Sequence, residues 1–222
     1  MRDRSQLLQD EYHRRFGDRA EYRDRVWKVL CADFFSRYIP RDAAVLDLGA
    51  GWGEFTRNVH AREKYAIDLN PETGRRVEGF ARFIQQDCSK PWPLADASLD
   101  VVFTSNFLEH LPAKELVDDT LREARRCLKP GGRIVCVGPN VRYVPGAYWD
   151  FWDHHIPITD LSMAEALELQ GFAVEERIDR FLPYTMSGNR ETPLAFVRAY
   201  LRMPFAWPLF GKQFLVVARR GA

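Results

Sequence analysis

The sequence predicts an α/β fold in which helices cover both faces of a doubly wound, mostly parallel sheet. Five short apolar segments follow one another between residues 43 and 138, each ends in a polar residue or a glycine, and helical or loop segments separate them. Strands that alternate with helices in this way form right-handed β-α-β units, and their ligands lie outside the carboxyl ends of the strands. Functional residues are therefore expected at the strand tips.

Two further strands are expected near the end of the chain, which brings the predicted sheet to seven strands. A crossover helix is predicted at residues 113–128, where apolar side chains share one face and LKPGG ends the helix. Another helix is predicted at 161–170 and stops at Gly171. The expected strands are 43–49, 64–69, 81–87, 99–105, 132–138, 172–181 and 213–220.

A single globular unit is expected, with an N-terminal helical cap at residues 1–42 and the main domain at 43–222. In the cap, apolar and aromatic residues recur at helical spacing. Residues 182–212 are rich in proline, aromatics and arginine, and are expected to form a lid-like insertion. Its part at 196–212 is expected to cover the active site, to meet lipid headgroups at a membrane surface, or to do both.

Composition and charge argue against several classes of protein. The chain has 32 lysines and arginines against 31 acidic residues, which argues against a nucleic-acid partner held mainly by phosphate contacts. The four cysteines lie far apart without a C-x-x-C pair, so we expect reduced thiols and no structural zinc. Neither a signal peptide nor an apolar run of about 18 residues is found, and a cytoplasmic protein without a transmembrane segment is expected.

A glycine loop, VLDLGAGWGEF, follows the first strand and precedes a helix. Gly49, Gly51 and Gly53 let the backbone turn sharply and approach a ligand closely. Glu54 stands where a dinucleotide fingerprint requires glycine or alanine, and would bring negative charge towards a pyrophosphate. A phosphate-binding P-loop is excluded because no Gly-Lys-Ser/Thr follows. The loop therefore suits a ligand without phosphates.

Acidic residues at the next two strand tips extend this site. Asp68 ends the second strand about 20 residues after the first, where a carboxylate accepts hydrogen bonds from ribose hydroxyls. Asp87 ends the third strand, where it is placed to accept from an adenine amino group. With the glycine loop, the two carboxylates predict an adenosine site.

These motifs resemble those of the class I S-adenosylmethionine-dependent methyltransferases, over residues 43–180 and the last strand. VLDLGAGWG resembles the first motif of the family, LDVVFTSNFLEHL its fourth, and LKPGG a later turn, while the segment between Asp68 and Asp87 is shorter than usual. The resemblance implies a Rossmann-like methyltransferase fold with an antiparallel last strand, and S-adenosyl-L-methionine as cofactor. The cofactor-binding residues that it implies are Asp47, Gly49, Gly51, Gly53, Asp68, Leu69, Asp87, Cys88 and Asn106.

Methyl transfer from a sulfonium is an in-line displacement, so the protein must position the acceptor, exclude water and, for a hydroxyl acceptor, remove a proton. Histidine suits that last task near neutral pH. The candidate catalytic residues are His110, after the fourth strand, and His154 and His155 in YWDFWDHHIP, after the fifth. Neighbours in an extended loop point opposite ways, so at most one of the tandem pair faces the pocket. Structural roles remain open for all three, with Asp150 or Asp153 as partners of the tandem pair.

A metal site is the sharper alternative for YWDFWDHHIP, because carboxylates and histidine nitrogens hold divalent ions. Adjacent residues rarely aim at one point, however, and we expect no metal. Tyr148, Trp149 and Trp152 are expected to pack, although aromatic faces also stack on sugar rings.

The expected function is methyl transfer to a small molecule, by O-methylation of a saccharide or a lipid-linked glycan. HHIPITDLS and the arginine-rich C-terminal segment look like a bacterial subgroup associated with surface-glycan and lipid-linked sugar pathways. No nucleic-acid partner is expected, and a peripheral contact with a membrane is one expectation. Two alternatives stay open: methyl transfer to another metabolite, such as a carboxylate or a phenol, and a non-catalytic S-adenosylmethionine-binding regulatory or scaffold protein.

Overall fold

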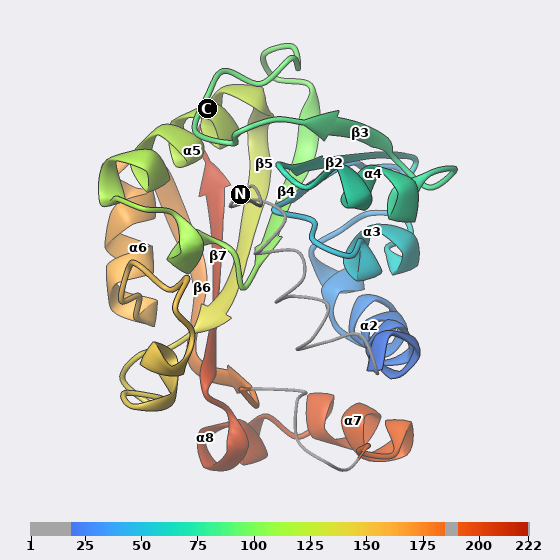
Figure 1. Ribbon diagram of the computed structural model, residues 1–222, viewed down its shortest axis with the longest axis vertical. Helices are drawn as coiled ribbons and strands as arrows, with labels where there is room; N and C mark the ends of the chain where they lie inside the picture. Colours follow the sequence, from blue (N-terminus) through green and yellow to red (C-terminus); the bar gives the residue numbers. More distant parts are fainter. Residues whose placement is uncertain (1–18, 185–190, 222) are drawn as a thin grey trace, which may run out of the picture.

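The computed structural model describes residues 19–184 and 191–221, and residues 1–18 of the predicted cap lie outside the described part. Each of the seven predicted strands is present (Figure 1). The strands are β1 (Ala44–Leu48), β2 (Glu63–Asp68), β3 (Arg82–Gln85), β4 (Leu99–Ser105), β5 (Leu128–Pro139), β6 (Phe172–Leu182) and β7 (Gln213–Arg220).

The strands form one sheet in the order β3-β2-β1-β4-β5-β7-β6. All pairs from β3 to β5 are parallel, and β7 lies antiparallel between β5 and β6. The carboxyl ends of β1 to β5 therefore meet at one edge of the sheet. The prediction of a doubly wound, mostly parallel seven-stranded sheet with an antiparallel last strand is confirmed.

Helices cover both faces of the sheet. The α-helices of the described residues are α2 (Ala20–Asp33), α3 (Glu54–Asn58), α4 (Pro71–Val77), α5 (Lys114–Cys127), α6 (Asp160–Leu169), α7 (Leu194–Leu201) and α8 (Trp207–Phe210). Short 3-10 turns are η2 (Phe35–Arg37), η3 (Leu108–His110), η4 (Ala147–Asp150) and η5 (Pro204–Ala206). Within the described ranges, no helix combines the length and the apolar character needed to cross a membrane.

Alternate residues of the strands enter two separate cores, because successive side chains of a strand point to opposite faces. Leu46 and Leu48 of β1 pack with apolar residues of α5 and α6. Val45 points the other way and packs with α2, α3, α7 and α8. This second core is aromatic, and Phe55 of α3 stacks on Phe103 of β4 with 3.7 Å between ring centroids. The described part of the predicted N-terminal cap is thus built into the second core.

The predicted lid-like segment is helical in its described part, and α7 and α8 lie at the end of the sheet towards which β5 points (Figure 1). Leu201 and Trp207 are buried in the second core, where Trp207 packs edge-on against Phe181. The Tyr200 hydroxyl donates a hydrogen bond to the carbonyl of Phe181 at 2.6 Å. The inner side of the segment is therefore anchored to the sheet, while exposed apolar side chains lie on its outer side: Phe196, Met203, Phe205, Leu209 and Phe210.

The prediction for LKPGG was wrong in one respect. Helix α5 already ends at Cys127, and β5 begins at Leu128, which pairs with Leu99 of β4. The next pair joins Arg133 to Val101, so the residues between Leu128 and Arg133 bulge out of the ladder. Gly131 adopts φ +79°, a left-handed conformation that glycine tolerates. The two glycines therefore shape a bulge within β5 instead of terminating the helix.

Candidate functional site

The glycine loop lies at the carboxyl end of β1 and takes a left-handed path, with φ +69° at Gly49, +55° at Gly51 and +73° at Gly53. A Cβ atom added to Gly49 would lie 2.1 Å from Cγ of Phe107, which follows the tip of β4. Only glycine fits under that ring. The contact between Gly49 and Phe107 joins the loop after β1 to the loop after β4.

Asp68 ends β2 and holds the glycine loop through its carboxylate. Its Oδ2 accepts a hydrogen bond from the Gly51 N–H at 2.7 Å, and its Oδ1 accepts from the Asn70 N–H at 2.8 Å. Burial raises the pKa of Asp68, and these backbone donors oppose that rise. Each carboxylate oxygen accepts two hydrogen bonds, so Asp68 keeps capacity for a ribose hydroxyl. Beside it, Leu69 is 66% exposed and presents an apolar surface to a flat base.

Asp47 and Glu54 are both buried, and each has a partner in the protein. The Thr56 hydroxyl donates to Oδ2 of Asp47, and burial raises the pKa of Asp47 to about 7 despite that bond. Glu54 forms an ion pair with Arg23 of α2, 3.0 Å from Nε to Oε1. The negative charge of Glu54, which the sequence placed near a ligand, is neutralised on the side of α2. Asp47 therefore stabilises the start of α3 from inside the protein.

The third strand tip carries Asp87 and Cys88. Oδ1 of Asp87 accepts hydrogen bonds from the Ser89 N–H at 2.9 Å and the Ser89 hydroxyl at 2.8 Å. The Cys88 thiol instead packs in the core against α5, and burial raises its pKa to about 12. Its carbonyl accepts from the indole Nε1–H of Trp92 at 2.8 Å. Cys88 therefore offers only its backbone to a ligand at this edge.

Asn106 follows β4 and is exposed at the same edge. It adopts φ +51°, and its N–H donates to the Val137 carbonyl of β5 at 2.9 Å. The side-chain amide donates to Oγ of Ser105 at 3.0 Å. Asn106 thus joins the glycine loop, Asp68 and Asp87 along the carboxyl ends of β1 to β4. This edge offers carboxylate acceptors, an exposed apolar side chain and a tight backbone turn, a set that suits an adenosine ligand without phosphates.

The histidine candidates lie next to this edge, on η3 and on the loop after η4. Nδ1 of His110 lies 3.0 Å from the Asp153 carbonyl oxygen and 3.3 Å from its Oδ2. Burial by itself lowers the pKa of His110, but the hydrogen bond to Asp153 and the charge of Glu109 outweigh it, so the pKa is raised. The rings of His110 and His154 meet edge to face, 4.8 Å between centroids.

The tandem histidines diverge, as the alternation of side chains in an extended loop predicts. His154 is buried between Tyr148 and Phe151, with its ring stacked on that of Phe151 at 5.0 Å. His155 is exposed, and its N–H donates to the Glu109 carbonyl at 2.8 Å. His110 and His154 are therefore brought together, and His155 is not.

Glu109 was not among the residues predicted for the site. It lies in η3 between Leu108 and His110, and only 2% of its surface is exposed. The signal in the sequence was an acid beside a histidine directly after a strand tip, but spacing alone does not show that the acid is buried.

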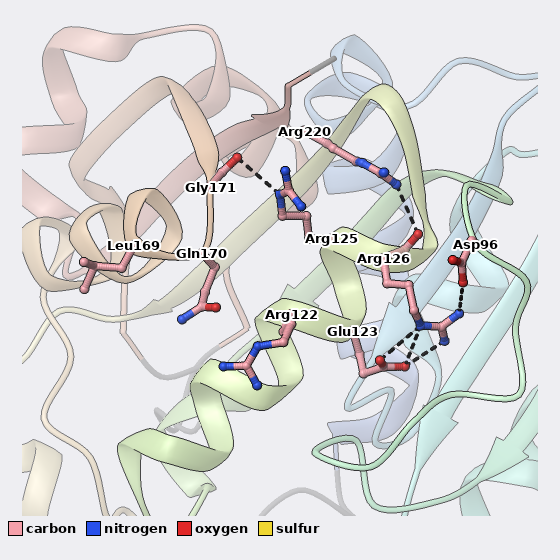
Figure 2. Close-up of a pocket in the computed structure, with 9 residues that line it drawn as sticks. All are labelled: Asp96, Arg122, Glu123, Arg125, Arg126, Leu169, Gln170, Gly171 and Arg220. Atoms are coloured by element: carbon pink, nitrogen blue, oxygen red, sulfur yellow. Dashed lines mark hydrogen bonds and ion pairs between the residues drawn. The ribbon is translucent and has the colours of Figure 1, made fainter.

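A cavity of about 630 Å³ lies at the opposite edge of the sheet, at the amino ends of β5 and β6 (Figure 2). Its arginines already have partners in the protein: Arg126 forms ion pairs with Asp96 and Glu123, and Arg125 donates to the Gly171 carbonyl. Arg220 donates to main-chain carbonyls as well. This cavity is far from the strand tips and is not the cofactor site.

Comparisons with known proteins agree with the geometry. Residues 46–136 match a family described as "Methyltransferase domain". A ubiquinone/menaquinone biosynthesis C-methyltransferase of Azotobacter vinelandii is 32% identical over 125 residues, 50% of this chain and 47% of the relative. A dimethylglycine N-methyltransferase of Parasynechococcus marenigrum is 34% identical over 112 residues, 46% of this chain and 39% of the relative. Residues 46–136 of this chain therefore resemble a methyltransferase domain, and both relatives are named as methyltransferases.

The fold of the chain is shared with solved structures. A SAM-dependent methyltransferase from Archaeoglobus fulgidus superposes with a TM-score of 0.67 at 21% identity, over 92% of this chain and 98% of the other. At that identity the likeness shows the fold alone. The chain also spans about half the length of the curated relatives that it matches, or less.

Proposed function

We propose that this protein transfers the methyl group of S-adenosylmethionine to a hydroxyl oxygen of a small molecule, a saccharide or a lipid-linked glycan. The observation that carries the proposal is the pairing of His110 with Asp153 next to the carboxyl ends of β1 to β4. A histidine whose second nitrogen is held by a carboxylate is the usual arrangement of a general base.

The residues at the strand tips fit the cofactor, which supplies an electrophilic methyl group on a sulfonium when it is bound. Asp68 would accept from the ribose hydroxyls, Asp87 from the adenine amino group, and Leu69 would pack on the base. Asn106 and the glycine loop would hold the methionine part through backbone and amide groups. None of these contacts requires a phosphate, and S-adenosylmethionine has none.

The candidate base is oriented before any acceptor arrives. Asp153 engages Nδ1 of His110, so Nε2 is the nitrogen that remains to take a proton from an acceptor hydroxyl. His154 packs edge-on against His110 and restricts its ring. In this proposal His110 receives the proton, and His154 holds the ring of His110 in position. The exposed His155 takes part only through its backbone.

Exposed aromatic side chains on the same loop support a saccharide acceptor. Trp149 is 53% exposed and Trp152 is 88% exposed, both within a few residues of His154. Trp149 packs edge-on against Tyr148, 5.2 Å between ring centroids, but keeps about half of its surface exposed. Indole faces stack on sugar rings, and the exposed indole surface on this loop suits that role.

The outer side of α7 to α8 supports the lipid-linked version of the acceptor. Phe205 and Phe210 are exposed there, with Arg202 nearby in the sequence and also exposed. Aromatic side chains next to a basic residue suit the headgroup boundary of an anionic membrane. Contact of α7 and α8 with a membrane would bring the carboxyl ends of β1 to β4 close to an acceptor anchored in lipid.

A carbon or nitrogen acceptor is the second candidate, because two of the curated relatives are named as a C-methyltransferase and an N-methyltransferase. An amine acceptor that is already deprotonated needs no base, so His110 would then serve only to position it. The position of the methyl group in the product distinguishes the candidates.

The test begins with calorimetry of S-adenosylhomocysteine binding to the purified chain. Transfer of labelled methyl from S-adenosylmethionine is then measured with nucleotide sugars, lipid-linked glycans, phenols and amines, and the product is located by NMR. We expect an O-methylated saccharide. Normal cofactor binding without transfer to any acceptor would favour the scaffold alternative, and a methyl group on carbon or nitrogen would overturn the assignment of the acceptor atom.

A further inference from the structure

Glu109, His110 and His154 form a cluster of potential metal ligands, although the proposed methyl transfer requires no metal ion. Each offers one ligand atom, and these atoms all lie within 4.8 Å of one another. Glu109 and His154 are 2% and 8% exposed, so the cluster is built into the protein. Its members come from η3 and from the loop after η4, which are distant in the sequence.

The cluster is preorganised by contacts around it. The N–H groups of His155 and Ile156 both donate to the Glu109 carbonyl, at 2.8 and 3.2 Å, and thereby tie the loop to η3. Asp153 engages Nδ1 of His110, which fixes the ring and leaves Nε2 to face an ion. A carboxylate behind a histidine ligand is the usual outer partner at metal sites, where it sets the tautomer and raises the basicity of the ligand.

The environment of Glu109 favours a cation. A buried carboxylate is costly unless it is paired or coordinates a metal. Among the ion pairs of the described residues, none joins Glu109 to a lysine or an arginine. Its neighbours include the two histidines, which as neutral imidazoles are metal ligands themselves, and the Asp153 carboxyl, a second negative charge that favours a cation.

We propose that Glu109, His110 and His154 bind one divalent transition-metal ion. Two imidazole nitrogens and one carboxylate oxygen are a donor set for zinc, manganese, cobalt or iron, whereas magnesium prefers oxygen ligands. Around an ion with bonds of about 2.1 Å, neighbouring donors lie about 3.4 Å apart, so small side-chain rotations close the cluster. The proposal replaces the expectation, drawn from the sequence, that no metal binds here.

With an ion bound, Nε2 of His110 is a ligand and cannot also take a proton, so His110 acts as the base only in the metal-free chain. Three protein ligands leave positions on the ion for water or for an oxygen of the acceptor, whose proton the ion makes more acidic. A role for the ion in binding the acceptor rests on the proposed function, because it assumes an oxygen acceptor next to the carboxyl ends of β1 to β4. Binding of the ion does not rest on it and is tested without turnover.

The experiment uses the untagged full chain, stripped of metal with a chelator and dialysed. Cobalt(II) is added while the visible absorption of the ion is followed, and zinc(II) binding is measured by calorimetry. We expect one ion per chain. Glu109→Gln and His154→Gln are each expected to weaken binding at least tenfold, while His155→Gln, the adjacent and exposed control, changes the affinity less than twofold.

The absence of saturable binding at one equivalent would overturn the proposal, as would equal losses in His154→Gln and His155→Gln. Melting curves and S-adenosylhomocysteine binding, measured without metal, show whether each variant is folded. If a buried variant is unfolded, His110→Gln carries the test, because its imidazole is partly exposed. If the chain binds the ion but methylates no saccharide, the metal site stands and the proposed function fails. If it methylates a saccharide but binds no ion, the proposed function stands and the metal site fails.

Discussion

Asp68 at the end of β2 accepts a hydrogen bond from the backbone N–H of Gly51, 2.7 Å away in the loop after β1. The carboxylate proposed to bind the ribose therefore also holds the glycine loop in place. A change at Asp68 is expected to affect both the contact with the cofactor and the shape of the loop that surrounds it.

Replacing Asp68 by alanine should weaken the binding of S-adenosylhomocysteine by about 1 to 3 kcal/mol, because the ribose loses its acceptor. Calorimetry measures the effect. Asp119→Ala, at a partly exposed position on α5, should leave the affinity unchanged. Equal affinities of wild type and Asp68→Ala would refute the ribose assignment.

Replacing Gly49 by alanine should lower the free energy of unfolding by about 2 to 4 kcal/mol, because the new Cβ meets Phe107 and the backbone has positive φ. Gly79→Ala is the matched control, since Gly79 has φ +76° but open space around it. It should cost only the backbone strain, about 1 to 2 kcal/mol. Urea unfolding compares the two, and similar losses would show that Phe107 yields to the added methyl group.

Asp47 should make stability depend on pH. Its pKa is about 7 in the folded protein and 3.8 ordinarily, so the folded chain keeps a proton that the unfolded chain releases between these values. The free energy of unfolding therefore falls as pH rises through that window, by about 4 kcal/mol at most. Asp47→Asn has no carboxyl to titrate at this position, so its free energy of unfolding does not fall in this way. The variant should therefore gain stability relative to wild type between pH 4 and pH 8. Unfolding curves at several pH values test it, and parallel curves would contradict the assignment.

Replacing His110 by alanine should lower the turnover by about 10²- to 10⁴-fold for a hydroxyl acceptor, because the proton acceptor is removed. Binding of S-adenosylhomocysteine should stay within a few-fold of wild type, and the same is expected for His154→Ala and His155→Ala. Initial rates at saturating cofactor provide the measurement. If His155→Ala reduces turnover as much as His110→Ala, the base is not the one proposed.

The double change Phe205→Ser with Phe210→Ser should reduce cosedimentation with anionic lipid vesicles if the outer side of α7 to α8 meets a membrane. Leu161→Ser with Leu169→Ser is the control, since these residues are also exposed but lie on α6. Equal losses in both variants, or no binding by the wild type, would remove the membrane contact from the proposal.

Much of the fold follows from local patterns. Short apolar runs between helical segments predicted all seven strands to within two residues at every end except the start of β5. That end differs by four residues, because pairing with β4 extends the strand through the LKPGG bulge. The orientation of Cys88 and the pairing of Glu54 with Arg23 were not predictable in this way. Both depend on which helix packs over the residue, and periodicity within a segment carries no information about that.

The sequence by itself determined the sheet, the glycine loop and the acidic strand tips, because each depends on residue types within one short segment. Only the tertiary structure decided which of the three candidate histidines lie together in one site. It buried His154 against His110 and Glu109 and left His155 exposed, through hydrogen bonds that tie the loop after η4 to η3. Contacts between segments distant along the chain are selected by packing of the whole domain, so the cluster becomes visible only once that packing is known.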